Sequence, residues 1–197
     1  MITTQDRDQP TLILIRGLPG SGKSYLATAL QEALGKDIAI TLDPDATDYT
    51  SRAYTDLSAA LTAEGIEEKF HPYRFLRSQA YEAITRSKVI IWNQGFTNLD
   101  GFTKTVVNLQ TYATDHDTKL ALLVIEVEVN PAIARRRVAI RAAQGGHDVP
   151  AEAFARFISD YGTFAGQGYH PIVVNGEDDV SVSVASVMQA LQELWDK

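Results

Sequence analysis

The stretch TLILIRGLPGSGKS, residues 11 to 24, decides the fold. It joins an apolar run, typical of a buried strand, to a loop with the spacing G-x-x-x-x-G-K-[ST], filled by Gly17, Gly22, Lys23 and Ser24. Leucines at helical spacing follow the loop. The motif therefore has the strand before it and the helix after it that its function requires, and we interpret it as a phosphate-binding loop.

Such a loop predicts a nucleoside triphosphate, ATP or GTP, together with Mg²⁺. Glycines allow backbone N–H groups to converge on phosphates, and the helix N-terminus adds a favourable dipole. Lys23 should reach the β and γ phosphates, and the Ser24 hydroxyl should bind Mg²⁺. The loop residues expected to hold the nucleotide are Gly17, Leu18, Pro19, Gly20, Ser21, Gly22, Lys23, Ser24 and Tyr25.

Short β-rich runs alternate with longer helical patterns along the rest of the chain. The expected strands begin at residues 11, 37, 87, 120 and 171. Strands that alternate with helices of this length indicate βαβ units. The sequence therefore predicts an α/β fold of three layers, the P-loop NTPase fold, with a five-stranded, mostly parallel sheet and helices on both faces. We expect one domain, 1–197, with a small helical lid at about 135–160.

Proline and asparagine mark several helix ends. Asn130 before Pro131 predicts an N-cap and a first helical turn, and Pro150 predicts the start of another helix that continues to residue 164. The segment 46–86 should hold two helices, divided near Gly65 and Pro72.

Composition narrows the class of protein. The chain has 197 residues, 45% of them hydrophobic, a formal charge of −7 and no cysteine. No disulfide or thiolate metal site is possible, and no long apolar segment suggests a leader or a membrane span. We expect a cytoplasmic protein with no membrane partner. The acidic charge argues against long nucleic acids as partners.

Two carboxylates follow the second expected strand, in the stretch LDPD. Asp43 and Asp45 would lie at the carboxyl edge of the sheet, where open parallel sheets bind ligands. Asp43 could then face Mg²⁺, and Asp45 could accept the proton of a substrate hydroxyl that attacks the γ-phosphorus. The alternative is that both residues only form a turn and cap the next helix.

Four arginines, at positions 135, 136, 137 and 141, lie on the first expected helix of the lid. Arg137 and Arg141 are four residues apart and share a helix face, so they could stabilise charge on the transferred phosphoryl group. Arg156, on the following helix, could bind the nucleotide phosphates. The alternative is a solvated helix face, and at least one of the consecutive arginines 135–137 must point to solvent.

Three patches of the sequence together resemble the zeta-toxin group of P-loop kinases: GLPGSGKS, LDPD, and the arginine-rich segment with GGHDVP, residues 135–157. More loosely they resemble polynucleotide 5′-kinases and chloramphenicol phosphotransferases. The resemblance implies transfer of a γ-phosphoryl group to a hydroxyl, with Asp45 as base, and lid arginines matched by Arg141 and Arg156. It also implies the strand order 2-3-1-4-5 and raises an inhibitory protein as a partner.

The chain departs from this group after the third strand, where relatives tend to have Asp or Glu. Here Trp92, Asn93 and Gln94 stand in that place. Trp92 is expected in the core or the pocket wall. Asn93 and Gln94 either line the acceptor site through neutral hydrogen bonds or only satisfy the turn.

Two further segments are candidates for ligand contacts. Arg52, Arg74 and Arg77 lie in the region where kinases of this fold hold the acceptor, although such arginines are often only solvated. Asn175 and Gly176 end the last strand and could contact a purine, or form an ordinary turn.

The function expected from these residues is phosphoryl transfer to a small molecule or nucleotide with a free hydroxyl. Two alternatives stay open. One is a switch that binds or hydrolyses a nucleoside triphosphate without an acceptor, and the other is a 5′-polynucleotide kinase.

Overall fold

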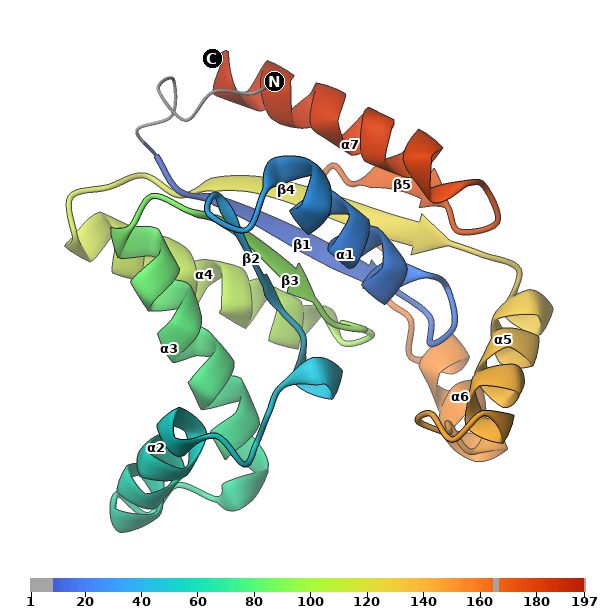
Figure 1. Cartoon of the computed structure of the whole chain (residues 1–197), viewed down its shortest axis with the longest axis horizontal. Coiled ribbons are helices and arrows are strands. Elements are labelled where there is room, and N and C mark those ends of the chain that lie inside the picture. The colour runs from blue at the N-terminus through green and yellow to red at the C-terminus, as the bar shows by residue number, and fades with distance from the viewer. Residues whose placement is uncertain (1–8, 165–166, 197) are drawn as a thin grey trace.

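Five parallel strands form one sheet in the computed structural model, which describes residues 9–164 and 167–196 (Figure 1). They are β1 (Thr11–Gly17), β2 (Ala39–Leu42), β3 (Val89–Asn93), β4 (Ala121–Glu128) and β5 (Ile172–Asn175). Their order is β2-β3-β1-β4-β5, and each neighbouring pair is parallel. All seven residues of the central strand β1 are buried, as a strand covered on both faces requires.

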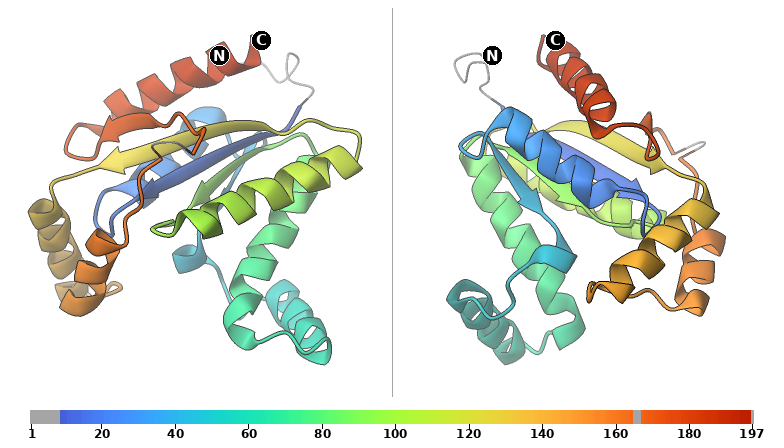
Figure 2. Two further views of the ribbon diagram at one scale, coloured as in Figure 1. Left: turned by 180° about the vertical axis from the view of Figure 1, so that it is seen from behind. Right: turned by 45° about the vertical axis from the view of Figure 1, so that its right-hand side comes forward.

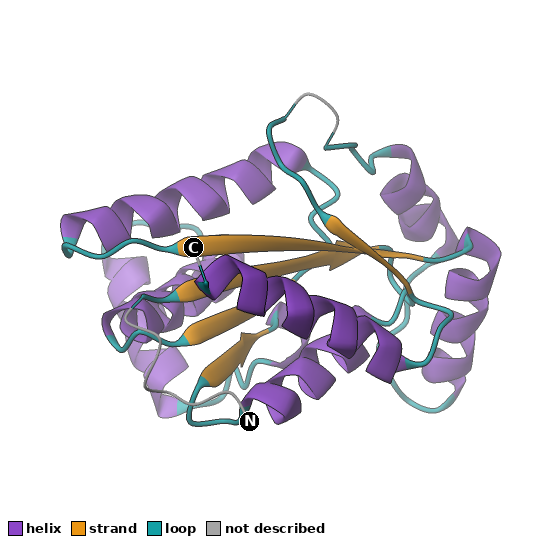
Figure 3. Cartoon of the chain, turned by 90° about the horizontal axis from the view of Figure 1, so that it is seen from above, coloured by secondary structure: helices purple, strands orange, loops and turns teal. Residues whose placement is uncertain are grey.

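Helices cover both faces of this sheet, as Figure 3 shows from above. The helices are α1 (Lys23–Leu34), α2 (Arg52–Ala63), α3 (His71–Thr85), α4 (Leu99–Asp115), α5 (Pro131–Ala143), α6 (Ala151–Ser159) and α7 (Val180–Trp195), with 3-10 turns η2 (Pro44–Ala46) and η3 (Glu68–Phe70). Helices α1 and α7 pack on one face and α3 and α4 on the other. The predicted fold class and strand order are confirmed.

Alternation along β1 creates the two cores. Leu12 and Leu14 point to the core beneath α3 and α4, while Ile13 and Ile15 point to the core beneath α1 and α7. All four side chains are fully buried. Both layers are therefore fixed to the strand that leads directly into the phosphate-binding loop.

Several predicted helix ends are confirmed. The Asn130 side chain accepts a hydrogen bond from the backbone N–H of Ala132 at 2.9 Å and caps α5. The two helices expected in segment 46–86 are α2 and α3, separated near Gly65, and Pro72 lies in the first turn of α3.

Helix α6 is shorter than predicted and ends at Ser159 instead of continuing to residue 164. Tertiary hydrogen bonds hold the chain that follows. The Arg16 Nη2 group donates to the Gly162 carbonyl at 2.6 Å, and the Gly162 N–H donates to the Thr97 carbonyl at 3.2 Å. These contacts between distant segments replace the local hydrogen bonds that would have extended the helix.

Two parts extend beyond the carboxyl edge of the sheet, α2 with η2 on one side and the pair α5 and α6 on the other (Figure 2). The α5–α6 pair has a small hydrophobic cluster of its own, formed by Ala134, Val138 and Phe154. Within the described ranges, no helix is both long enough and apolar enough to cross a bilayer. The expectation that the chain has no leader depends in part on residues 1–8. These residues lie outside the described ranges.

Candidate active site

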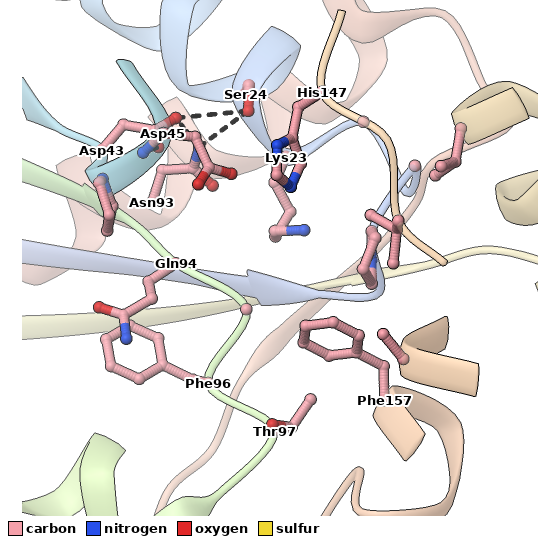
Figure 4. Close-up of a pocket in the computed structure, with 18 of the residues that line it drawn as sticks. Lys23, Ser24, Asp43, Asp45, Asn93, Gln94, Phe96, Thr97, His147 and Phe157 are labelled. Atoms are coloured by element: carbon pink, nitrogen blue, oxygen red, sulfur yellow. Dashed lines mark hydrogen bonds between the residues drawn. The ribbon is translucent and has the colours of Figure 1, made fainter. Parts of the chain in front are cut away.

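A pocket of about 740 Å³ opens at the carboxyl edge of the sheet. Its walls come from the loop between β1 and α1, the turn after β2, the segment after β3, and the α5–α6 pair. Figure 4 shows residues from these elements around one space. Ligands of open parallel sheets bind at this edge, so the pocket is the candidate active site.

The predicted phosphate-binding loop forms the floor of the pocket. Pro19, Gly20, Gly22, Lys23, Ser24 and Tyr25 line it. Of the other predicted loop residues, Ser21 is fully buried, Gly17 packs against Val127, and Leu18 lines a second pocket beside β4. The loop therefore exposes one part to the pocket and packs the rest against the sheet.

Gly20 shows why this loop needs glycine. Its φ angle is +81°, a region that favours glycine, and a Cβ atom at this position would lie 2.3 Å from the Ala134 carbonyl oxygen of α5. Any other residue would have to displace the backbone of α5. The loop is thus held against the helix that carries the pocket arginines.

Lys23 begins α1 and is half-buried in the pocket floor. Its Nζ donates a hydrogen bond to the Leu18 carbonyl oxygen at 2.9 Å, across the loop. Burial lowers the pKa of Lys23 from 10.5 to about 8, while the Asp43 and Asp45 carboxylates act to raise it. The lowered pKa means that the surroundings of Lys23 stabilise its charged form less than water does. An anionic ligand bound beside the ammonium would supply the missing stabilisation.

Asp43, Ser24 and Asn93 form one hydrogen-bonded group from three elements (Figure 4). The Ser24 hydroxyl donates to Asp43 Oδ2 at 3.4 Å, and Asn93 Nδ2 donates to Ser24 Oγ at 2.9 Å and to Asp43 Oδ2. Asp43 Oδ1 accepts from the Asp45 N–H at 2.8 Å and caps η2. Asp43 therefore caps a turn, as one interpretation has it, and it also faces Ser24; its expected role at Mg²⁺ stays a prediction.

Asp45 lies one residue beyond Pro44 on the same turn, and its carboxylate is exposed in the pocket. Asp43 and Asp45 therefore occupy different environments: the carboxylate of the first accepts hydrogen bonds from three donors, and that of the second faces the open space. The resemblance gave Asp45 the role of base, and its position leaves it accessible to a bound acceptor.

Arg137 and Arg141 both line the pocket, as their shared helix face predicts. Arg137 Nη1 donates to the Gly176 carbonyl at 2.7 Å, and Arg141 Nε donates to the His147 carbonyl at 3.1 Å. Arg156 does not line the pocket and is exposed. Helix α6 turns Phe154 and Phe157 inward, and its periodicity then directs Arg156 away.

The side chains after β3 are brought into the pocket, although no acid is among them. Asn93 is almost fully buried, at 3% exposure, and Gln94 lines the pocket. Gln94 Oε1 accepts a hydrogen bond from Trp92 Nε1 at 3.1 Å. Trp92 itself is buried in the core beneath α3 and α4, which confirms that interpretation.

The structure does not bring Arg52, Arg74 and Arg77 to the pocket, contrary to their expected role at the acceptor. Arg52 is 94% exposed and pairs with Asp56 within α2, which points away from the sheet. Helix α3 buries Phe75, and Arg74 beside it is exposed. Of the residues of α3, Tyr73 lines the pocket instead.

Asn175 and Gly176 also lie outside the main pocket. Asn175 lines the second pocket and bonds Asp178 at 2.9 Å. A Cβ atom at Gly176 would lie 2.1 Å from the Ser21 carbonyl oxygen, so this residue supports the phosphate-binding loop from behind. Gly176 therefore has a packing role, and the purine contact expected of the two residues stays a prediction.

Sequence reasoning missed most of the acceptor wall. Phe96, Thr97, Asn98 and Phe157 line the pocket, and they come from the loop after β3 and from α6. The available signal was Asn98, the N-cap of α4, which accepts from the Asp100 N–H at 2.7 Å. Such a cap fixes where the helix starts, and therefore where the preceding loop must cross the sheet edge.

Comparisons with solved structures show the same fold in several kinases. A gluconokinase from Sinorhizobium meliloti 1021 is 16% identical, with a TM-score of 0.58 and 96% of each chain covered. A sugar kinase from Janibacter sp. HTCC2649 is 15% identical, with a TM-score of 0.58, covering 93% of this chain and 95% of that chain. A deoxyadenosine kinase from M. mycoides with bound dATP is 18% identical, with a TM-score of 0.54, covering 91% and 98%.

These identities are low, so the likeness shows a shared fold and leaves the activity to be argued from the site. No curated protein matches the chain significantly. A family model described as an AAA domain matches residues 12–163, from β1 through the phosphate-binding loop to the segment after α6. This match covers well over half of the sequence, and the chain therefore belongs to the AAA domain family.

Proposed function

We propose that this protein is a kinase that transfers the terminal phosphoryl group of ATP or GTP to a hydroxyl of a small acceptor. One observation carries the proposal. Asp45, a second carboxylate besides Asp43, lines the same pocket as Lys23, Arg137 and Arg141. A protein that only bound the nucleotide would need no exposed base in this pocket, whereas one that hydrolysed it would use such a base to position water, so the acceptor assay below separates hydrolysis from transfer.

The chain offers suitable groups for the nucleotide and its metal. The loop backbone, Lys23 and the two pocket arginines fit a polyphosphate. Ser24 and Asp43 present the oxygen ligands that Mg²⁺ prefers, and Asn93 Oδ1 is buried without a hydrogen-bond partner among the described residues. When bound, Mg²⁺ would neutralise phosphate charge.

The transfer step follows from the positions of these residues. Lys23, Arg137 and Arg141 hold the phosphate oxygens and stabilise the charge that develops on them. The Asp45 carboxylate accepts the proton of the acceptor hydroxyl as its oxygen bonds to the terminal phosphorus. The bond from that phosphorus to the bridging oxygen breaks, and the nucleoside diphosphate leaves.

We infer that α5, α6 and the loop between them close over the bound ligands. Their separate hydrophobic cluster would let the pair move as a unit. Arg137 and Arg141 would then approach the phosphates as the acceptor is enclosed. The zeta-toxin-like plan of the active site, with Asp45 as base and Arg141 in the lid, is part of this proposal and rests on the resemblance of the three sequence patches.

The test compares Asp45→Asn with Asp37→Asn, an exposed aspartate just before β2, far from the pocket-forming turn after it. Both variants and the native chain are incubated with γ-labelled ATP or GTP, Mg²⁺ and an extract of small molecules. We expect Asp45→Asn to lower label transfer by about 10²- to 10⁴-fold with nucleotide affinity nearly unchanged. The Asp37→Asn variant should transfer normally.

Each other outcome has a definite meaning. An unchanged rate in Asp45→Asn removes this residue from the mechanism. Label released only to water supports a hydrolysing switch, and label on oligonucleotide ends supports a 5′-polynucleotide kinase. The similar structures are named for gluconate and deoxyadenosine, so the fold alone does not select the acceptor.

A further inference from the structure

The positive charge of the pocket is confined to one side. Its basic side chains are Lys23 of the phosphate-binding loop, Arg137 and Arg141 of α5, and His147 of the loop that follows. Arg137 bonds the Gly176 carbonyl at 2.7 Å and lies 3.5 Å from the Gly20 carbonyl oxygen, directly against the phosphate-binding loop. These cations are therefore grouped where the nucleotide phosphates would bind.

The opposite side has no such charge. Of the described residues, those that line the pocket from the turn after β2, from α3 and from the segment after β3 include no lysine or arginine, and neither do those from α6, which lies beside α5 and faces the segment after β3. Their ionisable groups are the carboxylates Asp43 and Asp45 and the phenol of Tyr73. Because Asp43 is bonded to Ser24 of the phosphate-binding loop, the free carboxylate that an acceptor would meet is that of Asp45, and the acceptor side carries negative charge without a cation.

Basic residues on nearby elements do not line the pocket. Arg52 pairs with Asp56 on α2, and Lys69 pairs with Glu67 at 2.7 Å. Arg74 is exposed outside the pocket. A phosphate or carboxylate on the acceptor would find no counterion here and would lie beside Asp45 and the nucleotide phosphates, which repel it.

The same side offers surface for a ring. Phe157 of α6 packs across from Gly95, where an added Cβ would lie 3.7 Å from the ring, and Thr97 lies near it (Figure 4). Tyr73 is 44% exposed at the pocket edge. Aromatic faces such as these bind flat or apolar parts of a ligand, while amides such as Gln94 supply neutral hydrogen bonds.

We propose that the acceptor is a neutral or cationic hydroxyl compound with a ring, carrying neither phosphate nor carboxylate. This inference rests on the proposed kinase function and adds a substrate class to it. The acidic acceptor side selects against anions by leaving them without a counterion, and a positively charged amine would instead be attracted to Asp45.

The experiment separates a small-molecule extract on an anion exchanger at pH 7. The unbound fraction holds neutral and cationic compounds, and the eluted fraction holds anions. Each is incubated with the full chain, Mg²⁺ and γ-labelled ATP or GTP, and labelled products are separated from phosphate. We expect transfer in the unbound fraction to exceed that in the eluted fraction at least tenfold.

A matched pair of variants tests the charge argument itself. Tyr73→Lys places a cation on the acceptor side, and Phe70→Lys places one at a residue that is equally exposed but outside the pocket. Tyr73→Lys should reduce the preference for the unbound fraction at least fivefold, and Phe70→Lys should leave it unchanged.

The outcomes distinguish this inference from the proposed function. Transfer mainly to anionic compounds, or an unchanged preference in Tyr73→Lys, overturns the inference and leaves the kinase proposal intact. Label found only in free phosphate with both fractions, although the nucleotide binds, overturns the kinase proposal and the inference with it.

Discussion

The two sides of the pocket are built in different ways. The phosphate side is formed by backbone: a fully buried strand, a glycine held against Ala134, and a lysine at the first turn of α1. The acceptor side is formed by side chains of loops and helix ends, among them Tyr73, Thr97 and Phe157. One side is fixed by the sheet, and the other depends on how distant segments meet.

This difference fits what each side must bind. All nucleoside triphosphates share their phosphate groups, so a rigid backbone cradle serves any of them. Acceptors differ from one enzyme to the next, and side chains on loops can change without altering the sheet. Changes on the phosphate side should therefore affect all activity, whereas changes on the acceptor side, apart from the proposed base Asp45, should affect selectivity.

Among changes on the phosphate side, the largest effect is expected from Lys23→Met. The variant removes a cation that contacts phosphate in both the ground state and the transition state, so nucleotide affinity and the transfer rate should both fall. We expect transfer to drop about 10²- to 10³-fold. Lys36→Met, an exposed lysine at the other end of α1, is the control and should behave as the native chain does.

Arg16 joins β1 to the segment after α6, and its loss should destabilise the protein. This fully buried arginine in β1 donates to the Tyr161 hydroxyl at 3.1 Å, lies 3.8 Å from Glu126, and stacks on the rings of Tyr161 and Phe164. Burial raises the pKa of Tyr161, so the phenol stays neutral beside it. Arg16→Met should lower the free energy of unfolding by about 3 kcal/mol in denaturant titrations.

The control for that change is Arg86→Met. Arg86 forms an ion pair with Glu82 on the surface of α3, with both side chains more than 60% exposed. Its loss should cost less than about 0.5 kcal/mol, because exposed pairs contribute little. Equal losses in the two variants would contradict a structural role for the buried arginine.

A pH titration should sharpen the account of the phosphate side. The pKa of Lys23 is lowered to about 8, and a bound polyphosphate would raise it. Below pH 8 the Lys23 side chain of the free protein is mostly protonated, and its ammonium binds phosphate. Above pH 8 that side chain has lost its proton, so the protein must take up a proton when the nucleotide binds. Affinity should therefore fall above pH 8 by up to about tenfold per pH unit.

Calorimetry in buffers of different ionisation enthalpy would detect the proton uptake directly. Lys23→Arg keeps a positive charge at every pH of the titration, so its affinity should not follow this profile. Affinity in the native chain that stays constant from pH 7 to 9 would contradict the low pKa.

The smallest effect is expected from Arg74→Ala combined with Arg77→Ala. Neither side chain lines the pocket, so the KM for the acceptor should change by less than about twofold. Steady-state kinetics with any acceptor found in the extract would measure it. A tenfold increase in KM would place these arginines at the acceptor after all and would weaken the charge argument.

The sequence predicted those features that depend on neighbouring residues. The five strands, the cap at Asn130 and the phosphate-binding loop are each set by a few adjacent side chains, through burial, hydrogen bonding or glycine geometry. Arg137 and Arg141 were predicted together because helical spacing places them on one face. The structure agrees on all of these.

Predictions about individual arginines elsewhere are not supported by their positions in the structure, for a common reason. Arg52, Arg74 and Arg156 were placed near ligands from composition and order along the chain, but the direction of each depends on which helix face is buried. That face is chosen by packing against other elements, and a basic residue on a surface helix carries no local signal of it.

The sequence by itself determined the parallel sheet, the phosphate-binding loop and its lysine, because buried alternation and glycine conformation act over short distances. Only the tertiary structure decided which side chains share the pocket with that loop. The Asp43, Ser24 and Asn93 group joins residues up to 69 positions apart, and the acidic acceptor side joins four separate segments. Contacts between residues so far apart in the sequence depend on the packing of the whole chain. A local sequence pattern therefore does not predict them.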